Sequence, residues 1–155
     1  MTIMKKSSRM LERPTQTKAE TETFIIMVKI NGQEAMVLLD SGCTTEAISP
    51  EMVQIVGLKV HQLMKQIPIQ LGTKGSKSWI NHGMKACIKI GTADNYHYFD
   101  VINIDRYNVI IGMVFMKQHR IMLDFEKDQV RMRGKNLYAL CESVDEYLQV
   151  CRQVM

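Results

Sequence analysis

One short segment combines residue types that could do chemistry: an acid, a hydroxyl residue and a glycine, placed directly after an apolar run. The acid is Asp40, followed by Ser41 and Gly42, and the apolar run is Val37–Leu39. Such a triplet is often an ordinary turn after a strand. It also suits a catalytic loop, in which Asp40 supplies one carboxylate, Ser41 hydrogen-bonds across a subunit interface and Gly42 lets the backbone approach its neighbour closely.

The elements around the triplet favour the catalytic interpretation. Strands are predicted over Phe24–Ile30 and Ala35–Leu39, and the Asn-Gly pair between them is the strongest short signal for a hairpin. This hairpin leads directly into Asp40. A later apolar run, Asn108–Gly112, predicts a short buried strand that could cross beneath the loop and support it.

The rest of the chain predicts many short strands and few helices. Ser49 followed by Pro50 predicts the start of a short helix that Gly57 ends, and a second helix is predicted over Met113–His119. Further strands are predicted over Ile67–Leu71, Ser78–His82, Met84–Ile90, Tyr96–Ile104, Ile121–Phe125 and Gln129–Met132. The first two of these would form a hairpin. The fold class is therefore mainly β, a small barrel-like arrangement with one or two short helices.

Length and composition indicate one domain with short tails. The chain has 155 residues, a formal net charge of +4 and 46% hydrophobic residues. None of its four Cys forms a C-x-x-C pair and no His lies at a zinc-like spacing from them, so we expect no metal, no cofactor and no disulfide framework. No apolar run reaches signal-peptide or membrane-spanning length, so we expect a cytoplasmic protein in a reducing compartment, without membrane contact.

The two ends of the chain lack the apolar pattern of the middle. Residues 1–22 are polar and charged and are expected to be a disordered N-terminal linker. Residues 134–155 are expected to be a C-terminal linker, partly helical around Val144–Val150 at most. The domain would then span residues 23–133. The basic N-terminal residues have no aromatic residues between them, so nucleic-acid binding is not expected.

In order and spacing these pieces resemble the retropepsins, the aspartic proteases of retroviruses and long-terminal-repeat retrotransposons, and in particular those of gypsy-class elements. The resemblance covers residues 23–133, and its matching segments are Val37–Thr44, Ile67–His82, Tyr107–Met116 and Ile121–Phe125. Two positions depart from the family pattern, because Cys43 stands where Ala is usual and Asn108 stands where related elements often carry Asp. The resemblance implies a retropepsin-like closed barrel, the acid-protease half fold.

The resemblance also implies an aspartic endopeptidase in which Asp40 is catalytic. Two carboxylates about 3 Å apart share one proton, and together they activate a water and protonate the scissile carbonyl. The chain has one Asp-Ser-Gly and no Asp-Thr-Gly, so the second carboxylate would come from another copy in a homodimer.

The remaining site residues follow from the same resemblance. Support of the catalytic loop is assigned to Ser41, Gly42, Thr44, Ile111 and Gly112. The flap and substrate-binding residues would be Gly72, Thr73, Lys74, Gly75 and Ser76. The substrate would be an extended peptide, by resemblance the element's own polyprotein.

Alternatives remain open at this point. The domain could be a catalytically inactive retropepsin-like module for dimerisation or peptide binding, a cellular relative resembling the ubiquitin-shuttle proteins, or an unrelated β-domain that binds nucleic acid through its basic tail. The role of Cys43 is open as well. Trp79 is predicted to be a partly buried anchor, and the four His are predicted to be surface or satisfied structural residues.

Overall fold

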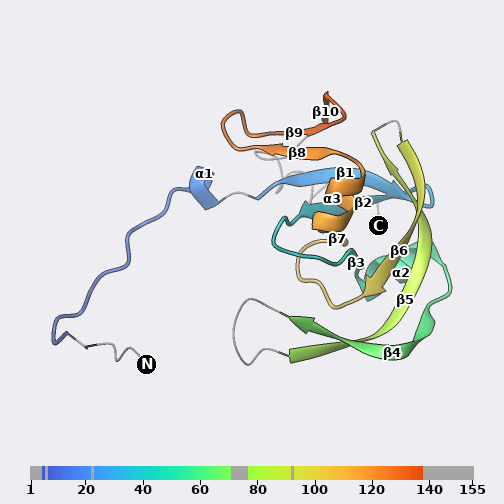
Figure 1. Ribbon diagram of the computed structural model, residues 1–155, viewed down its shortest axis with the longest axis horizontal. Helices are drawn as coiled ribbons and strands as arrows, with labels where there is room; N and C mark the ends of the chain where they lie inside the picture. The colour runs from blue at the N-terminus through green and yellow to red at the C-terminus, as the bar shows by residue number, and fades with distance from the viewer. Residues whose placement is uncertain (1–4, 6, 22, 71–76, 92, 138–155) are drawn as a thin grey trace.

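The computed structural model describes residues 5, 7–21, 23–70, 77–91 and 93–137. Its helices are α1 (Lys18–Thr21), α2 (Pro50–Val56) and α3 (Met113–Gln118). Its strands are β1 (Ile25–Ile30), β2 (Gln33–Leu39), β3 (Ala47–Ile48), β4 (His61–Gln70), β5 (Lys77–Ile90), β6 (Ala93–Val101), β7 (Val109–Ile111), β8 (Ile121–Asp124), β9 (Gln129–Met132) and β10 (Lys135–Leu137) (Figure 1). None of the helices in these ranges is long and apolar enough to span a membrane.

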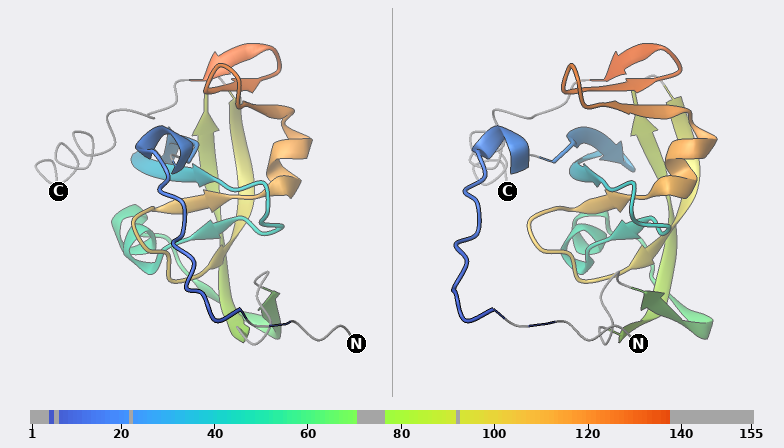
Figure 2. Two further views of the ribbon diagram at one scale, coloured as in Figure 1. Left: turned by 90° about the vertical axis from the view of Figure 1, so that its left-hand side faces the viewer. Right: turned by 60° about the vertical axis from the view of Figure 1, so that its left-hand side comes forward.

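The strands close into a barrel. Neighbouring strands run in the order β1, β2, β7, β3, β6 and β5, and β5 pairs back with β1 through Lys29 beside Lys89 and Ile30 beside Ile88. β4 continues from β5 as an antiparallel arm. β8, β9 and β10 form a small separate sheet, which lies over the end of the barrel opposite to this arm (Figures 1 and 2). The predicted mainly-β closed barrel with few short helices is confirmed.

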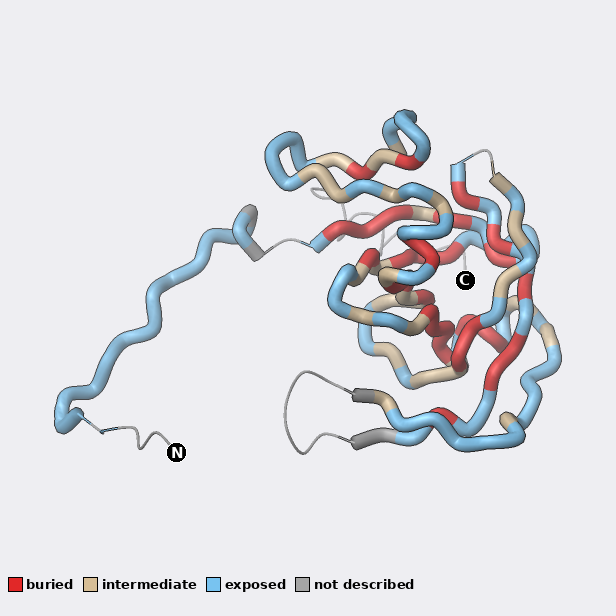
Figure 3. The backbone as a smooth tube through the Cα atoms, in the orientation of Figure 1, coloured by how far each residue is buried: buried red, intermediate tan, exposed pale blue. Residues whose placement is uncertain are grey.

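The core follows from strict alternation along the barrel strands. On β5, Met84, Ala86, Ile88 and Ile90 are all buried, whereas the residues between them are exposed (Figure 3). This is the face that the sequence pattern predicts. Each large apolar side chain buried in this way stabilises the fold by about 1.5–3 kcal/mol.

Local signals at turns and helix ends are confirmed. Asn31 and Gly32 take positive φ values of 46° and 82°, which suits a tight hairpin between β1 and β2. The Ser49 Oγ accepts a hydrogen bond from the Met52 N–H at 3.1 Å at the start of α2. Gly57 ends that helix with a φ of 73°.

Several predicted boundaries are wrong. The two strands predicted over Ser78–His82 and Met84–Ile90 are one continuous strand, β5, because Gly83 does not interrupt it. A Cβ atom at Gly83 would lie 2.3 Å from the Tyr98 hydroxyl oxygen, so this glycine makes room for a neighbouring side chain. β6 begins at Ala93 and ends at Val101, earlier than the predicted Tyr96–Ile104.

The tails also contain structure that the sequence analysis did not predict. Within residues 1–22, Thr17 and Glu20 form a reciprocal cap on α1, with hydrogen bonds of 3.2 and 2.9 Å. Within residues 134–155, β10 pairs with β9, and Leu137 packs on the core. The domain therefore extends at least to Leu137. The marginal helix predicted around Val144–Val150 lies outside the described residues.

Candidate active site

Asp40 comes directly after β2 and opens the 40–46 loop, which leads to β3. β2 and β7 are parallel neighbours, with Leu38 beside Ile110 and Leu39 beside Ile111. The Asp40 N–H donates to the Ile111 carbonyl oxygen at 2.9 Å. The strand pairing therefore fixes the backbone up to the first residue of the loop.

The loop turns back on Asp40. The Gly42 N–H donates to Asp40 Oδ1 at 3.0 Å, and the Cys43 N–H donates to the Asp40 carbonyl oxygen at 3.1 Å. Asp40 is half-buried, whereas Ser41, Gly42 and Thr44 are exposed. The carboxylate is thus held by its own loop beside a surface that a second molecule can reach.

α3 begins against the second half of the loop. The Met113 N–H donates to the Cys43 carbonyl oxygen at 2.7 Å. A Cβ atom at Gly112 would lie 2.5 Å from that oxygen and 2.8 Å from the Thr45 carbonyl oxygen. Since side chains do not tolerate such distances, a glycine at 112 is needed for β7 and α3 to approach the loop this closely.

Cys43 is a half-buried thiol inside the loop. It donates a hydrogen bond to the Thr45 carbonyl oxygen at 3.2 Å. Burial raises the pKa of the Cys43 thiol, the bond to Thr45 lowers it, and the carboxylates of Asp40, Glu46 and Asp100 raise it further. The thiol therefore stays neutral and packs as a small apolar group.

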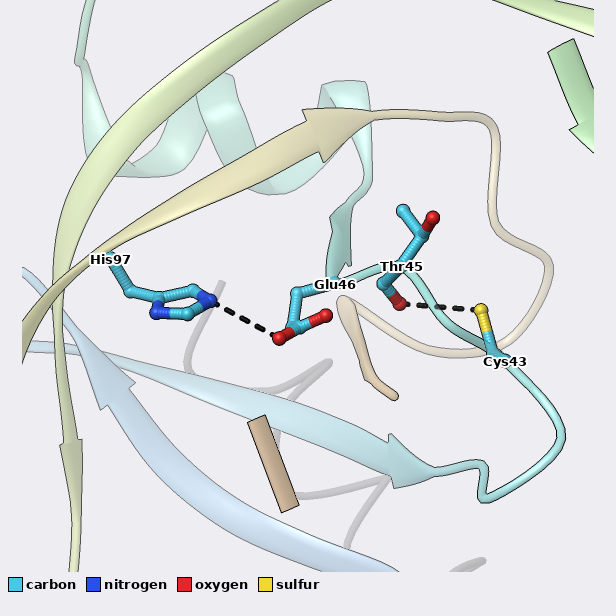
Figure 4. A network of polar contacts seen from close by, with 4 residues as sticks. All are labelled: Cys43, Thr45, Glu46 and His97. Carbon is cyan, nitrogen blue, oxygen red and sulfur yellow. Dashed lines mark hydrogen bonds and ion pairs between the residues drawn. The ribbon is translucent and has the colours of Figure 1, made fainter. Parts of the chain in front are cut away.

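The far end of the loop carries a contact that sequence reasoning missed. Glu46 is only 7% exposed, and its Oε1 lies 3.3 Å from His97 Nε2 (Figure 4). The His97 ring makes edge contacts with the rings of Phe99 and Phe115. Of the two predictions for His97, surface or structural, the structure supports the structural one. Glu46 gave no sequence signal, because a lone acid before a two-residue strand has no periodicity to reveal its burial.

A second buried carboxyl group lies beside this contact. The Asp100 N–H donates to the Glu46 carbonyl oxygen at 2.9 Å, and the Tyr98 hydroxyl donates to Asp100 Oδ1 at 2.6 Å. Burial raises the pKa of Asp100, the Tyr98 hydrogen bond lowers it, and the Glu46 charge raises it. Burial, followed by the bond to Asp100, raises the pKa of Tyr98.

The predicted flap is described only in part. Its arms β4 and β5 pair with Pro68 beside Trp79. The flap residues Gly72, Thr73, Lys74, Gly75 and Ser76 lie outside the described residues. Trp79 is 56% exposed, so it is more exposed than a partly buried anchor would suggest. The next residue, Ile80, takes the buried face of β5, and the alternation of a strand therefore turns Trp79 outward.

An apolar surface borders the exposed side of the loop. A hollow of about 430 Å³ has Ser41 on one wall and residues of α3 and β8 on the others. Two of its lining side chains are large, apolar and strongly exposed, Met122 at 53% and Phe125 at 79%. We call Met122 of β8 and Phe125, which directly follows β8, the β8 patch. Exposed apolar clusters of this kind are typical of surfaces that contact another molecule.

Residues 36–141 match the family described as the PEG10/RTL1 protease domain, and this stretch is well over half of the chain. The chain belongs to that family. It is thus a retropepsin-like protease domain, and the matched stretch contains the 40–46 loop, the arm of β4 and β5, β7 and α3. No curated protein matches the sequence closely.

Two solved structures share the fold of this chain. The retroviral protease-like domain of Ddi1 from Leishmania major superposes with a TM-score of 0.62 and 18% identity, over 77% of this chain and 95% of that one. The EIAV protease, solved in complex with the inhibitor HBY-793, superposes with a TM-score of 0.50 and 18% identity, over 63% of this chain and 88% of that one. At such identities the likeness concerns the fold alone, and it confirms the predicted retropepsin-like barrel.

Proposed function

We propose that this domain is an aspartic endopeptidase that works as a homodimer, with Asp40 as the catalytic carboxylate of each chain. The observation that carries the proposal is the 40–46 loop, in which Asp40 is braced by β7 while Ser41 and Gly42 stay exposed beside it. The sequence contains a single Asp-Ser-Gly, so the second carboxylate needs a second copy. A twofold axis at the loop would pair each Asp40 with its own counterpart.

The proposed chemistry is that of a carboxyl pair sharing one proton. Two like charges at about 3 Å do not both ionise, so one Asp40 is charged and the other is protonated. The charged member takes a proton from a water that attacks the scissile carbonyl carbon, and the protonated member donates to the carbonyl oxygen.

The β8 patch supports the dimer. It places exposed apolar side chains of Met122 and Phe125 next to Ser41, in the same hollow. Packing this patch against a second copy would remove these side chains from water and bring the two loops together. Formation of one dimer would therefore bury the patch and also complete the carboxyl pair.

The substrate we propose is an extended peptide that lies between the loop and the arm of β4 and β5. A peptide bound as a strand uses main-chain hydrogen bonds for affinity and alternate side chains for specificity. By the resemblance to the proteases of gypsy-class elements, its natural source would be the polyprotein of such an element.

The test is cleavage of a denatured protein by the purified chain, with and without pepstatin, beside the variant Asp40→Asn. We expect pepstatin-sensitive cleavage that Asp40→Asn lowers by a factor on the order of 10³ or more. Circular dichroism would verify that the variant is folded. Cleavage that Asp40→Asn leaves intact would contradict the proposal, and a stable dimer without any cleavage would favour the inactive dimerisation or peptide-binding module.

A further inference from the structure

Glu46 is a buried charged residue that the proposed chemistry does not use. It ends the 40–46 loop, directly before β3, and its side chain is almost fully removed from solvent. A carboxylate in such a place is unfavourable unless a partner compensates it. The partner is His97, whose Nε2 lies 3.3 Å from Glu46 Oε1.

His97 is itself held rigidly. Its ring stands edge-on to Phe99, with centroids 5.4 Å apart and an angle of 70°, and edge-on to Phe115, at 5.0 Å and 85°. Phe99 belongs to β6 and Phe115 to α3, and both are fully buried. These two rings restrain the imidazole, whose side chain is 20% exposed, and so help to hold it beside the Glu46 carboxylate.

The 40–46 loop is anchored at both ends. At the first end, the Asp40 N–H is bound by the Ile111 carbonyl oxygen of β7 at 2.9 Å. At the last end, the Glu46 carbonyl oxygen accepts from the Asp100 N–H of β6 at 2.9 Å. The Glu46–His97 contact adds a side-chain anchor to the last end, and Figure 4 shows it on the same stretch of chain as the bond between Cys43 and Thr45.

We propose that Glu46 and His97 are positioning residues of the active site, whose partly buried contact holds the last end of the 40–46 loop and thereby fixes the geometry of Asp40. This inference rests on the proposed function of Asp40. A shift of about 1 Å in a reacting group lowers a rate by a factor on the order of 10². Peptide binding along the cleft depends much less on such a shift. Loss of the contact is therefore expected to lower kcat while KM changes little.

Three single variants test the contact by steady-state kinetics. Glu46→Gln keeps an acceptor for His97 Nε2, Glu46→Met keeps the length of the side chain without an acceptor, and His97→Phe fills the aromatic site without a donor. We expect kcat to fall by about tenfold to a hundredfold in the last two, with KM within about threefold, and Glu46→Gln to retain most of kcat. The double variant that combines Glu46→Met with His97→Phe should lose no more kcat than the worse of these two single variants, because both changes remove the same contact.

Asn31→Ala is a control for a general loss of stability. Asn31 lies in the hairpin between β1 and β2, and its Oδ1 accepts from the Cys87 N–H at 2.7 Å. The change weakens the fold away from the loop and should leave kcat unchanged below the unfolding temperature. Equal losses of kcat in Asn31→Ala and Glu46→Met, or additive losses in the double variant, would overturn the inference.

Amide hydrogen exchange tests the same contact without any need for activity. The Cys43 and Met113 N–H groups are both bonded within or onto the loop. Glu46→Met and His97→Phe should speed exchange at these two amides by about tenfold or more, while the Asn31 N–H, bonded to the Cys87 carbonyl oxygen, stays protected. If the wild-type chain cleaves nothing, the proposed function fails, and exchange alone then decides the positioning role. Unchanged exchange at Cys43 and Met113 would overturn it.

Discussion

At the scale of single residues, the buried Asp100 makes the stability of the fold depend on pH. Its carboxyl group is buried beside the Tyr98 hydroxyl, and burial is the largest cause of its raised pKa. A carboxyl group whose pKa is higher in the folded state than in the unfolded state binds more protons when folded. The fold therefore loses stability as the pH rises from the ordinary value of 3.8 through the folded pKa.

We accordingly expect Asp100→Asn to raise the midpoint of thermal unfolding at about pH 7 and to change it little near pH 3. The amide carries no charge to bury, and its oxygen can still accept from Tyr98. Unfolding followed by circular dichroism across this pH range measures the difference. Asp94→Asn, at an exposed position of the same strand, is the control. A midpoint difference that does not depend on pH would contradict the prediction.

The two described cysteines should react differently with an alkylating agent. The thiolate is the reactive form, and burial raises the pKa of Cys43, whereas Cys87 is exposed. We expect iodoacetamide to modify Cys43 more slowly than Cys87 by at least about tenfold in the folded protein. Mass spectrometry of peptides after timed quenching measures both rates. Equal rates in the folded state would show that the Cys43 thiol is not protected, and equal rates after unfolding are the internal control.

The position of the candidate loop after a buried strand could be predicted, because the loop begins with a sequence signature. Asp40, Ser41 and Gly42 follow a strand in a recognisable triplet, and Gly112 ends a short apolar run. Glu46 and His97 could not be predicted as partners, because they lie far apart in the chain and neither type is usually buried. Their burial is decided by where β3, β6 and α3 meet, which no local pattern encodes.

At the scale of elements, Asn108 joins β7 to β2 ahead of the loop. Its Oδ1 accepts from the Met36 N–H at 2.8 Å, and its own N–H donates to the Met36 carbonyl oxygen at 3.0 Å. The side chain thus replaces a strand partner at the point where pairing between β2 and β7 begins. The departure from the family's frequent Asp at this position preserves the acceptor oxygen.

Asn108→Ala should lower the free energy of unfolding by about 1–2 kcal/mol, because the Met36 N–H loses its acceptor in a partly buried place. Asn108→Asp keeps an oxygen there and should lose less. Urea denaturation of the two variants and the wild type measures the effect. Equal losses in both variants would mean that the oxygen at this position does not matter.

Elements with local signals were predicted well and those fixed by distant contacts were not. Asn31-Gly32 and the caps Ser49 and Gly57 act within a few residues of the chain, so the sequence suffices to place them. The sequence predicts two strands on either side of Gly83, but the strand is continuous, and the Tyr98 ring beside Gly83 explains why a glycine occurs inside it. β10 has only three residues and depends on β9 for all its pairing.

At the scale of the whole molecule, the proposed dimer depends on burial of the β8 patch. Met122→Glu places a charge on an exposed side chain of this patch, so the single chain should fold as before. Burial of that charge between two copies is unfavourable, and we expect dimer dissociation constants to rise by about tenfold to a hundredfold. Sedimentation velocity over a concentration series measures this change.

If the active site needs two chains, the weaker dimer of Met122→Glu should also cleave its substrate more slowly. Met122→Glu should have low activity at dilution and regain it as the protein concentration increases. Lys127→Glu, an exposed charge change outside the lining of the hollow, is the control. An unaltered dimer in Met122→Glu would place the interface elsewhere, and full activity in a monomeric variant would contradict the two-chain site.

The open side of the 40–46 loop has a consequence for timing. If each chain brings half of a carboxyl pair, the hydrolysis rate of scarce, mostly separate chains grows with the square of their number. A newly synthesised chain would then be inactive by itself. It would cleave peptides only where the local concentration of chains is high enough for dimers to form. At low concentration the chains would stay separate and inactive, and no inhibitor would be required.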